Sequence, residues 1–229
     1  MNKRTDAVRY QASESFVVGA LLTIVGGYLD AYTYLCRGGV FANAQTGNIA
    51  ALGFCIVDGN WYDVFHRVTM ILAFVAGIIL CNAVEHKLKH AAQIHWRQIV
   101  VLLEAILLGA VALIPHGGHD LIVNDAISLV CAMQVECFRK MRGIVVASTM
   151  CTGSLRSGTR QLFVFLRERN VEALRTCLKY YIMIALFVAG VAIGAALTNL
   201  WMEWSSLVCC GVLLTVFCLL FVKKDGVIL

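Results

Sequence analysis

The chain has 229 residues, of which 60% are hydrophobic and only 14% are charged, and it contains a single proline. Lys and Arg number 19 against 14 Asp and Glu, and the mean hydropathy is +0.78. These values exclude an ordinary water-soluble domain and indicate an integral membrane protein. We therefore expect the lipid bilayer to surround most of the chain, and we expect no nucleic-acid partner.

Six apolar stretches are long enough to cross roughly 30 Å of hydrocarbon as helices. In chain order they are residues 16–35, 64–84, 98–114, 121–137, 179–200 and 205–222. Two shorter and more polar segments, 40–57 and 144–166, each carry a Thr-Gly pair. The first apolar run is too long for a cleavable signal peptide, so we expect it to remain as a helix.

Two features recur at one offset, which indicates an internal repeat. Asp30 precedes Thr46 by the same sixteen residues that separate Glu136 from Thr152, since 136 − 30 and 152 − 46 both equal 106. The tetrapeptide Phe-Val-Ala-Gly also occurs twice, at an offset of 113, beginning at Phe74 and Phe187. We expect a single integral membrane domain, 1–229, with repeat halves of about 16–114 and 121–222.

Lys and Arg in the loops predict the orientation, because cytoplasmic loops retain positive charge. Basic residues cluster at 3–9, 87–97, 139–142, 156–179 and 223–224, whereas loops 58–63, 115–120 and 201–204 are poor in them. If all eight segments crossed, loop 85–97 would lie outside and violate the rule. If the two Thr-Gly segments re-enter on one side, every basic cluster and both termini lie in the cytoplasm.

The sequence therefore predicts an all-α, polytopic membrane protein. It has six transmembrane helices plus two re-entrant or broken Thr-Gly segments. Three crossings in each half make the second half start from the opposite face, which gives a 3+3 inverted repeat of the kind found in secondary transporters. The alternative is that the small residues of the Thr-Gly segments let two intact helices pack closely.

Polar groups at membrane depth form the candidate site. Short hydroxyl and amide side chains can bond their own backbone, while Gly47 and Gly153 allow a tight or left-handed turn. Ionisable side chains in a transmembrane segment are costly without a partner or water. We predict a substrate or ion cavity lined by Asp30, Thr46, Gly47, Asn48, Gln134, Glu136, Thr152, Gly153 and Ser154.

Two roles are open for the acids Asp30 and Glu136. In the first they couple transport to protons or cations, holding a proton when buried and releasing it when a cation or substrate arrives. In the second they are structural, and either cap the following segment or pair with Arg37 or Arg139. Glu104 has no acidic counterpart in the other half, and we expect it to pair with a basic residue near the cytoplasmic end.

Signatures of catalysis and metal binding are missing from the sequence. The ten cysteines lie in or beside apolar segments without a C-x-x-C pair, which is typical of buried hydrophobic residues. His86, His90 and His95 lack a carboxylate or cysteine that would complete a metal site. There is no nucleotide-binding glycine motif, no nucleophile elbow and no H-E-x-x-H. We expect no enzyme activity, no cofactor and no bound metal.

Ordered motifs in both halves resemble a known family. The first-half set is Gly27-x-x-Asp30-Ala31, the Gly-Gly pair 38–39, Phe41 and Thr46-Gly47-Asn48. It resembles the signature of the YoaK-like bacterial inner-membrane proteins, a family of unknown function, and Gln134 and Thr152-Gly153 resemble its second-half counterpart. The resemblance extends over about 15–222. The chain departs from it at Gln45, where Met is common, and at Val135, where Asn is usual.

The resemblance implies a compact multi-pass protein of the bacterial inner membrane, often supposed to be a transporter. From the residues we expect a secondary transporter for a small polar solute or ion, either proton-coupled or driven by the gradient of the solute itself. A channel-like or lipid-handling protein, and a structural or regulatory membrane partner, are the alternatives. The sequence also leaves a homodimer open.

Overall fold

The computed structural model describes residues 15–89, 95–141, 144–145 and 151–221. Their regular secondary structure is helical apart from one pair of two-residue antiparallel strands, in which Lys140 pairs with Val145. The elements in chain order are α1 (Phe16–Cys36), α2 (Gln45–Val57), α3 (Trp61–Leu88), α4 (Trp96–Val111), α5 (Asp120–Cys137), β1 (Lys140–Met141), β2 (Ile144–Val145), α6 (Cys151–Glu168), α7 (Val171–Trp201), the 3-10 helix η2 (Met202–Ser205) and α8 (Ser206–Leu219).

Three stretches are long and apolar enough to cross a membrane: Phe16–Cys36, Trp61–Leu88 and Val171–Leu219, the last of which contains both α7 and α8. This agrees with the composition, and the chain is a membrane protein. Helices α4 and α5 are shorter, with 16 and 18 residues. Helix length and hydropathy alone therefore do not establish the six crossings, which stay a prediction.

Helices α1 and α7 pack side by side through glycine. A Cβ atom added at Gly190 would collide with the carbonyl oxygen of Ile24, and one added at Gly194 would lie 2.8 Å from the Cα of Tyr28. Gly27 meets the backbone of α7 in the same way. Because the contacting residues advance together along both helices, α1 and α7 are parallel.

Helices α3 and α5 repeat this arrangement. The Ser128 hydroxyl donates a 2.9 Å hydrogen bond to the carbonyl of Met70, and a Cβ atom added at Gly77 would collide with the backbone of Leu129. These two helices are therefore also parallel. Gly77 and Gly190 end the two copies of the repeated Phe-Val-Ala-Gly tetrapeptide, so the repeat supplies the same close approach twice.

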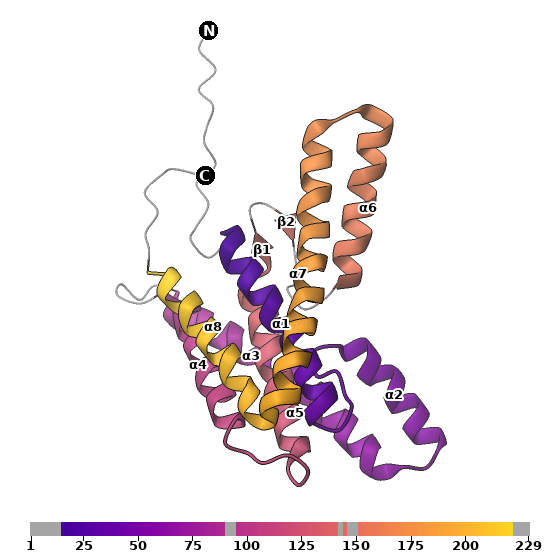
Figure 1. Cartoon of the computed structure of the whole chain (residues 1–229), viewed down its shortest axis with the longest axis vertical. Helices are drawn as coiled ribbons and strands as arrows, with labels where there is room; N and C mark the ends of the chain where they lie inside the picture. Colours follow the sequence, from indigo (N-terminus) through magenta and orange to yellow (C-terminus); the bar gives the residue numbers. More distant parts are fainter. Residues whose placement is uncertain (1–14, 90–94, 142–143, 146–150, 222–229) are drawn as a thin grey trace.

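The two parallel pairs run in opposite directions. Gln134 on α5 donates a 3.0 Å hydrogen bond to the carbonyl of Leu22, early in α1, whereas Asn124 donates a 2.8 Å bond to the carbonyl of Arg37, just after α1 ends. Helices α1 and α5 are therefore antiparallel. Helices α4 and α8 form a further antiparallel pair, and Figure 1 shows these helices gathered into one bundle.

Helices α2 and α6 lie at the periphery, and each forms a hairpin with the helix that follows it (Figure 1). Both begin near the mid-height of the molecule in this view, and from there α6 extends upwards and α2 downwards. Large apolar side chains of α2 are exposed, namely Ile49, Phe54, Ile56 and Val57. In a membrane protein such side chains face lipid or another protein rather than water.

The Thr-Gly pairs lie inside helices and not at the chain reversal. Gly47 and Gly153 belong to the first turns of α2 and α6, and neither has a positive φ. The expectation of a left-handed turn at these two glycines is wrong. In the first half the reversal precedes α2, where Gly38 and Gly39 have φ of 84° and 72°. The stretch just before α6 lies outside the described residues.

Replacing Gly190 with Ala should weaken the contact between α1 and α7, because the added methyl group has no room beside Ile24. Overpacking of this kind costs about 1–3 kcal/mol, so we expect a lower thermal unfolding midpoint in mild detergent. Gly211→Ala on α8 is the matched control, since nothing lies within 4 Å of its added Cβ. An unchanged midpoint for Gly190→Ala would contradict the packing of α1 against α7.

Candidate functional site

Asp30 anchors the chain reversal between α1 and α2. Its side chain is on α1 and 7% exposed, and Oδ1 accepts a 3.2 Å hydrogen bond from the backbone N–H of Asn43. The Asn43 amide in turn donates a 2.8 Å bond to the carbonyl of Gly26, and the Thr33 hydroxyl accepts from the N–H of Ala42 at 3.3 Å. Side chains and carbonyls of α1 therefore hold the start of α2 in place.

The start of α6 also approaches Asp30. The Asp30 carboxylate is near enough to interact electrostatically with the thiol of Cys151, the first residue of α6. Asp30 thus lies close to the beginnings of both peripheral helices, one from each half. Because helix N-termini carry partial positive charge, a carboxylate is favourably placed there.

The first turn of α2 is clamped against α3 and α5. The Gln45 amide donates a 2.7 Å hydrogen bond to the hydroxyl of Ser128 on α5. Asn48, which is buried, accepts a 2.9 Å bond from the Arg67 guanidinium on α3 and donates to the carbonyl of Phe41. This turn therefore joins the first half to α5 of the second half through polar contacts.

Polar side chains of this turn, of the reversal before it and of the helices α3 and α5 that pack beside it form a set that we name the hinge cluster: Asn43, Gln45, Asn48, Arg67, Asn124 and Asp125. Five of its buried polar atoms have no hydrogen-bond partner within the described part of the chain: Asn43 Oδ1, Gln45 Oε1, Arg67 Nε, Asn124 Oδ1 and Asp125 Oδ1. Buried polar atoms are usually paired, so the cluster is a candidate site for a polar ligand.

The orientation of the amides in the hinge cluster is fixed by their donors. The amide nitrogens of Asn43, Gln45 and Asn124 each donate to a backbone carbonyl. Flipping any of them would therefore lose a good hydrogen bond. Four of the unpaired atoms are acceptors and one, on Arg67, is a donor. This set complements a solute richer in hydrogen-bond donors than in acceptors.

The predicted cavity residues divide into two groups. Thr46, Gly47, Thr152 and Gly153 are exposed. The buried members are Asp30, Asn48, Gln134 and Ser154, and Glu136 is half-buried. Of these, Asp30 and Asn48 are connected through the reversal that precedes α2, whereas Gln134 is bonded to the carbonyl of Leu22 closer to the start of α1.

The side chains of Glu136 and Asp30 do not lie together in the structure. Asp30 lies eight residues beyond Leu22, and Glu136 lies two residues beyond Gln134 in the opposite direction, which separates them by roughly 15 Å along the helix axes. Glu136 forms a 3.4 Å ion pair with Arg139 and accepts a 3.2 Å hydrogen bond from Asn82. These contacts favour the structural role that the sequence left open for this acid.

Arg37, which the sequence offered as a structural partner for Asp30, pairs with a different acid. Its side chain is 0% exposed, and it donates at 2.7 Å to the Tyr32 hydroxyl and at 2.7 Å to the carbonyl of Ile114. It also forms a 3.2 Å ion pair with Asp120. The sequence did contain one indication of this role. Arg37 lies at the end of the bundle where the distribution of Lys and Arg predicts few positive charges, so a buried partner was to be expected.

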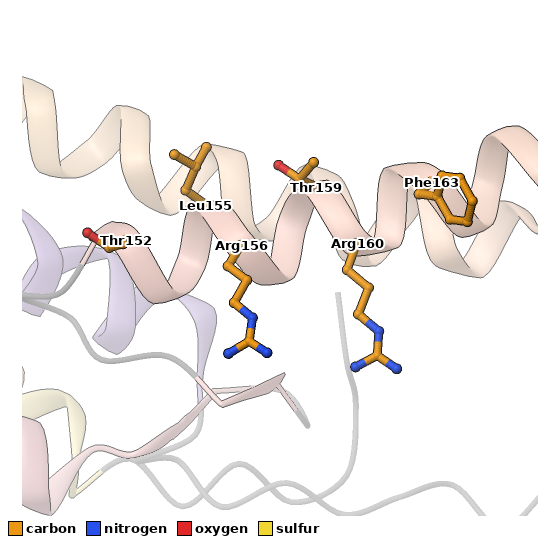
Figure 2. A pocket seen from close by; sticks show the side chains of 6 residues that line it. All are labelled: Thr152, Leu155, Arg156, Thr159, Arg160 and Phe163. Atoms are coloured by element: carbon orange, nitrogen blue, oxygen red, sulfur yellow. The ribbon is translucent and has the colours of Figure 1, made fainter.

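A second surface feature lies on α6. Figure 2 shows Arg156 and Arg160 pointing the same way from this helix. They border a shallow pocket of about 540 Å³, lined by Thr152, Leu155, Arg156, Thr159, Arg160 and Phe163. No ion pair involves either arginine in the part of the chain that the structure describes. Within that same part, no three His, Cys, Asp or Glu side chains are grouped to hold a metal ion.

Residues 18–219 match the family described as "Protein of unknown function (DUF1275)". The chain is 27% identical over 186 residues to the UPF0700 transmembrane protein YoaK of Bacillus subtilis (strain 168), and the alignment covers 77% of this chain and 80% of that protein. No solved structure matches the chain. The family resemblance drawn from the ordered motifs is confirmed.

Asp120→Asn should destabilise the protein, because it leaves the buried Arg37 charge without its counter-ion. Breaking a buried pair from one side costs about 3 kcal/mol or more. We expect this loss in the free energy of unfolding, measured by denaturation in mixed detergent micelles. The control is Glu172→Gln, which breaks an exposed pair with Arg175 and should cost under about 1 kcal/mol. Equal losses in the two variants would refute the role of Arg37.

Proposed function

We propose that this chain, a membrane protein that belongs to the DUF1275 family, is a secondary transporter for a small polar solute or ion. The observation that carries the proposal is the convergence of α2 and α6, one from each half, on Asp30 beside the hinge cluster. Half-helices that begin at a shared central point from opposite sides are a recurring architecture of secondary transporters.

The packing of the helices supports an inverted repeat. Exchanging the halves replaces α1, α3 and α4 with α5, α7 and α8. The exchange turns the parallel contact of α1 with α7 into the parallel contact of α5 with α3. It also turns α4 into α8 and α8 into α4, so the contact between these two helices is unchanged. Since α1 and α5 are antiparallel, the exchange also reverses direction. We propose 3+3 inverted repeats of about 16–114 and 121–222.

The bundle also supports six crossings with two re-entrant segments. Parts of α1, α3, α4, α5, α7 and α8 run together in the central bundle, whereas α2 and α6 lie outside it beside the outer parts of α3 and α7 (Figure 1). Lys87, Lys89 and Arg97 lie where α3 ends and α4 begins, and acidic Asp58, Asp63, Asp120 and Glu203 lie at the other end. In our proposal the basic end faces the cytoplasm of a bacterial inner membrane.

The proposed mechanism is alternating access to the hinge cluster. A solute with several donors binds the unpaired amide and carboxylate oxygens there and contacts both halves through Gln45 and Asn124. Close glycine contacts of α1 with α7 and of α3 with α5 lie between the halves. A small rotation of one half against the other at these contacts changes which end reaches the cluster. Asp30 responds to this rotation, since it lies near the start of both peripheral helices.

Lipid handling is a second candidate, favoured by one observation. The pocket on α6 combines two arginines with the apolar side chains of Leu155 and Phe163 (Figure 2). Arginine beside apolar surface at the cytoplasmic end suits an anionic lipid headgroup and its chain. In this reading Arg156 and Arg160 act as a headgroup site, and the hinge cluster is only structural.

Transport should depend on Asp30 and Arg67. A ligand found by thermal-shift screening of metabolites should raise the melting temperature by mass action, and proteoliposomes should take it up with saturation. We expect Asp30→Asn and Arg67→Met to reduce uptake at least ten-fold while both variants remain folded. Glu172→Gln, at an exposed position on α7, is the control.

Non-saturating flux would indicate a channel instead. Lipid handling would be favoured by two results together. Uptake would be unchanged in Asp30→Asn and Arg67→Met, and lipid binding would be lost in the double variant Arg156→Gln/Arg160→Gln. If neither flux nor lipid transfer occurs for any compound, the structural or regulatory alternative stands.

The orientation predicts which positions an impermeant thiol reagent reaches. After removal of the ten native cysteines, a cysteine at Asp58 should react from outside intact cells. A cysteine at Lys87, equally exposed in the structure, should react only after the membrane is opened. Labelling of position 87 from outside would overturn both the six crossings and the cytoplasmic position of the basic end.

A further inference from the structure

Glu104 is a buried acid without a partner. It lies on α4 with 0% of the residue exposed, and neither carboxyl oxygen has a hydrogen-bond partner in the described chain. The expectation that a basic residue pairs with it is therefore wrong for that part of the protein. Asp30 and Glu136 each have at least one polar contact, so Glu104 differs from both acids that the repeat singles out.

The titratable groups around Glu104 are thiols. Cys81 on α3 and Cys131 and Cys137 on α5 are near enough to interact with it electrostatically. From α8, Cys210 turns its thiol to the carbonyl of Ala105. Thiols with ordinary acidity are neutral near pH 7, so none of them neutralises a carboxylate.

The nearest cation on α4 is engaged elsewhere. The Arg97 guanidinium lies 4.8 Å over the Trp96 ring, and its Nε donates a 3.2 Å hydrogen bond to the carbonyl of Cys137. Within the described residues no ion pair reaches Glu104. An ionised carboxylate in dry surroundings without a partner is far more costly than the neutral acid.

We propose that Glu104 is a proton-binding site of the helix bundle. It holds a proton while α3, α4, α5 and α8 pack around it, and it releases that proton when the packing loosens enough to admit water. Glu104 contacts elements of both halves, so relative motion of the halves changes its exposure. A role for Glu104 in proton-coupled transport rests on the proposed transport function. In that case Glu104 binds the proton that is transported with the solute.

The repeat limits the stoichiometry to one such proton per chain. Under the 106-residue offset the position equivalent to Glu104 is Cys210, whose thiol donates to a backbone carbonyl, and under the 113-residue offset of the tetrapeptide it is Phe217. The second half therefore has no acid at this place. The backbone is duplicated here, but the protonatable group is not.

The test compares wild type with Glu104→Gln, a neutral side chain of the same shape. The unfolding equilibrium constant is measured in mixed detergent micelles from pH 5 to pH 8. In wild type the unfolded chain releases a proton that the folded protein holds, so rising pH favours unfolding by up to ten-fold per pH unit. We expect the ratio of wild-type to Glu104→Gln constants to rise accordingly.

Glu136→Gln is the control, because its carboxylate is already paired with Arg139 and its ratio should not rise with pH. A flat ratio for Glu104→Gln would overturn the proposal. If Glu104→Gln fails to fold, wild type is treated with dicyclohexylcarbodiimide, which adds to protonated carboxyl groups in apolar surroundings. Peptide mass mapping should then place the adduct on Glu104, and adducts confined to other acids would overturn the site.

Coupling is tested separately in proteoliposomes. Glu104→Gln should still exchange solute between the two sides but lose accumulation driven by a pH gradient. If Glu104→Gln still accumulates solute in response to a pH gradient, the role of Glu104 in coupling is overturned. The expected change in the unfolding ratio would still identify Glu104 as a proton-binding site. If the wild-type protein shows no uptake at all, the proposed transport function is refuted, but the conclusion that Glu104 binds a proton is unaffected.

Discussion

The reversal between α1 and α2 depends on hydrogen bonds that α1 supplies. Lipid offers no partner for backbone N–H and C=O groups, and each unsatisfied group costs several kcal/mol. Here Asp30 accepts from the N–H of Asn43, Thr33 accepts from that of Ala42, and the Asn43 side chain returns a bond to Gly26. In the proposed re-entrant arrangement these partners let the chain leave helical geometry inside the membrane, so that α2 begins beside the hinge cluster.

Close helix packing provides the frame for that reversal. In a membrane there is little hydrophobic force between helices, so small residues that let backbones approach decide which helices pair. Gly190 against Ile24 and Gly77 against Leu129 bring α7 to α1 and α3 to α5 with the same parallel geometry. The duplicated tetrapeptide therefore specifies the same contact in both halves. Both contacts join one half to the other, so the proposed motion of the halves takes place at these glycine interfaces.

Much of the backbone was predictable from local pattern, whereas the polar contacts were not. The apolar stretches locate most of the long helices within a few residues, although α7 begins at Val171, eight residues before the predicted span. The 106-residue offset predicts the two halves. The reversal was misplaced because Gly47 looks like a turn residue, yet Gly38 and Gly39 adopt the positive φ. The pairing of Arg37 with Asp120, 83 residues away, depends on tertiary packing that no local spacing encodes. The same limit explains the missed role of Arg67 and the wrong partner for Glu104.

Three acids of one bundle have three different surroundings, and this separates their roles. Glu136 has an ion pair with Arg139, and Asp30 has a backbone N–H donor. Glu104 has neither. Protonating an ordinary glutamate at pH 7 costs about 4 kcal/mol, less than the penalty of an unpaired buried carboxylate. In the proposed inverted repeat, a symmetric backbone thus holds an asymmetric set of charges. Alternating access needs the symmetry, whereas coupling to one proton needs a single site that differs between the halves.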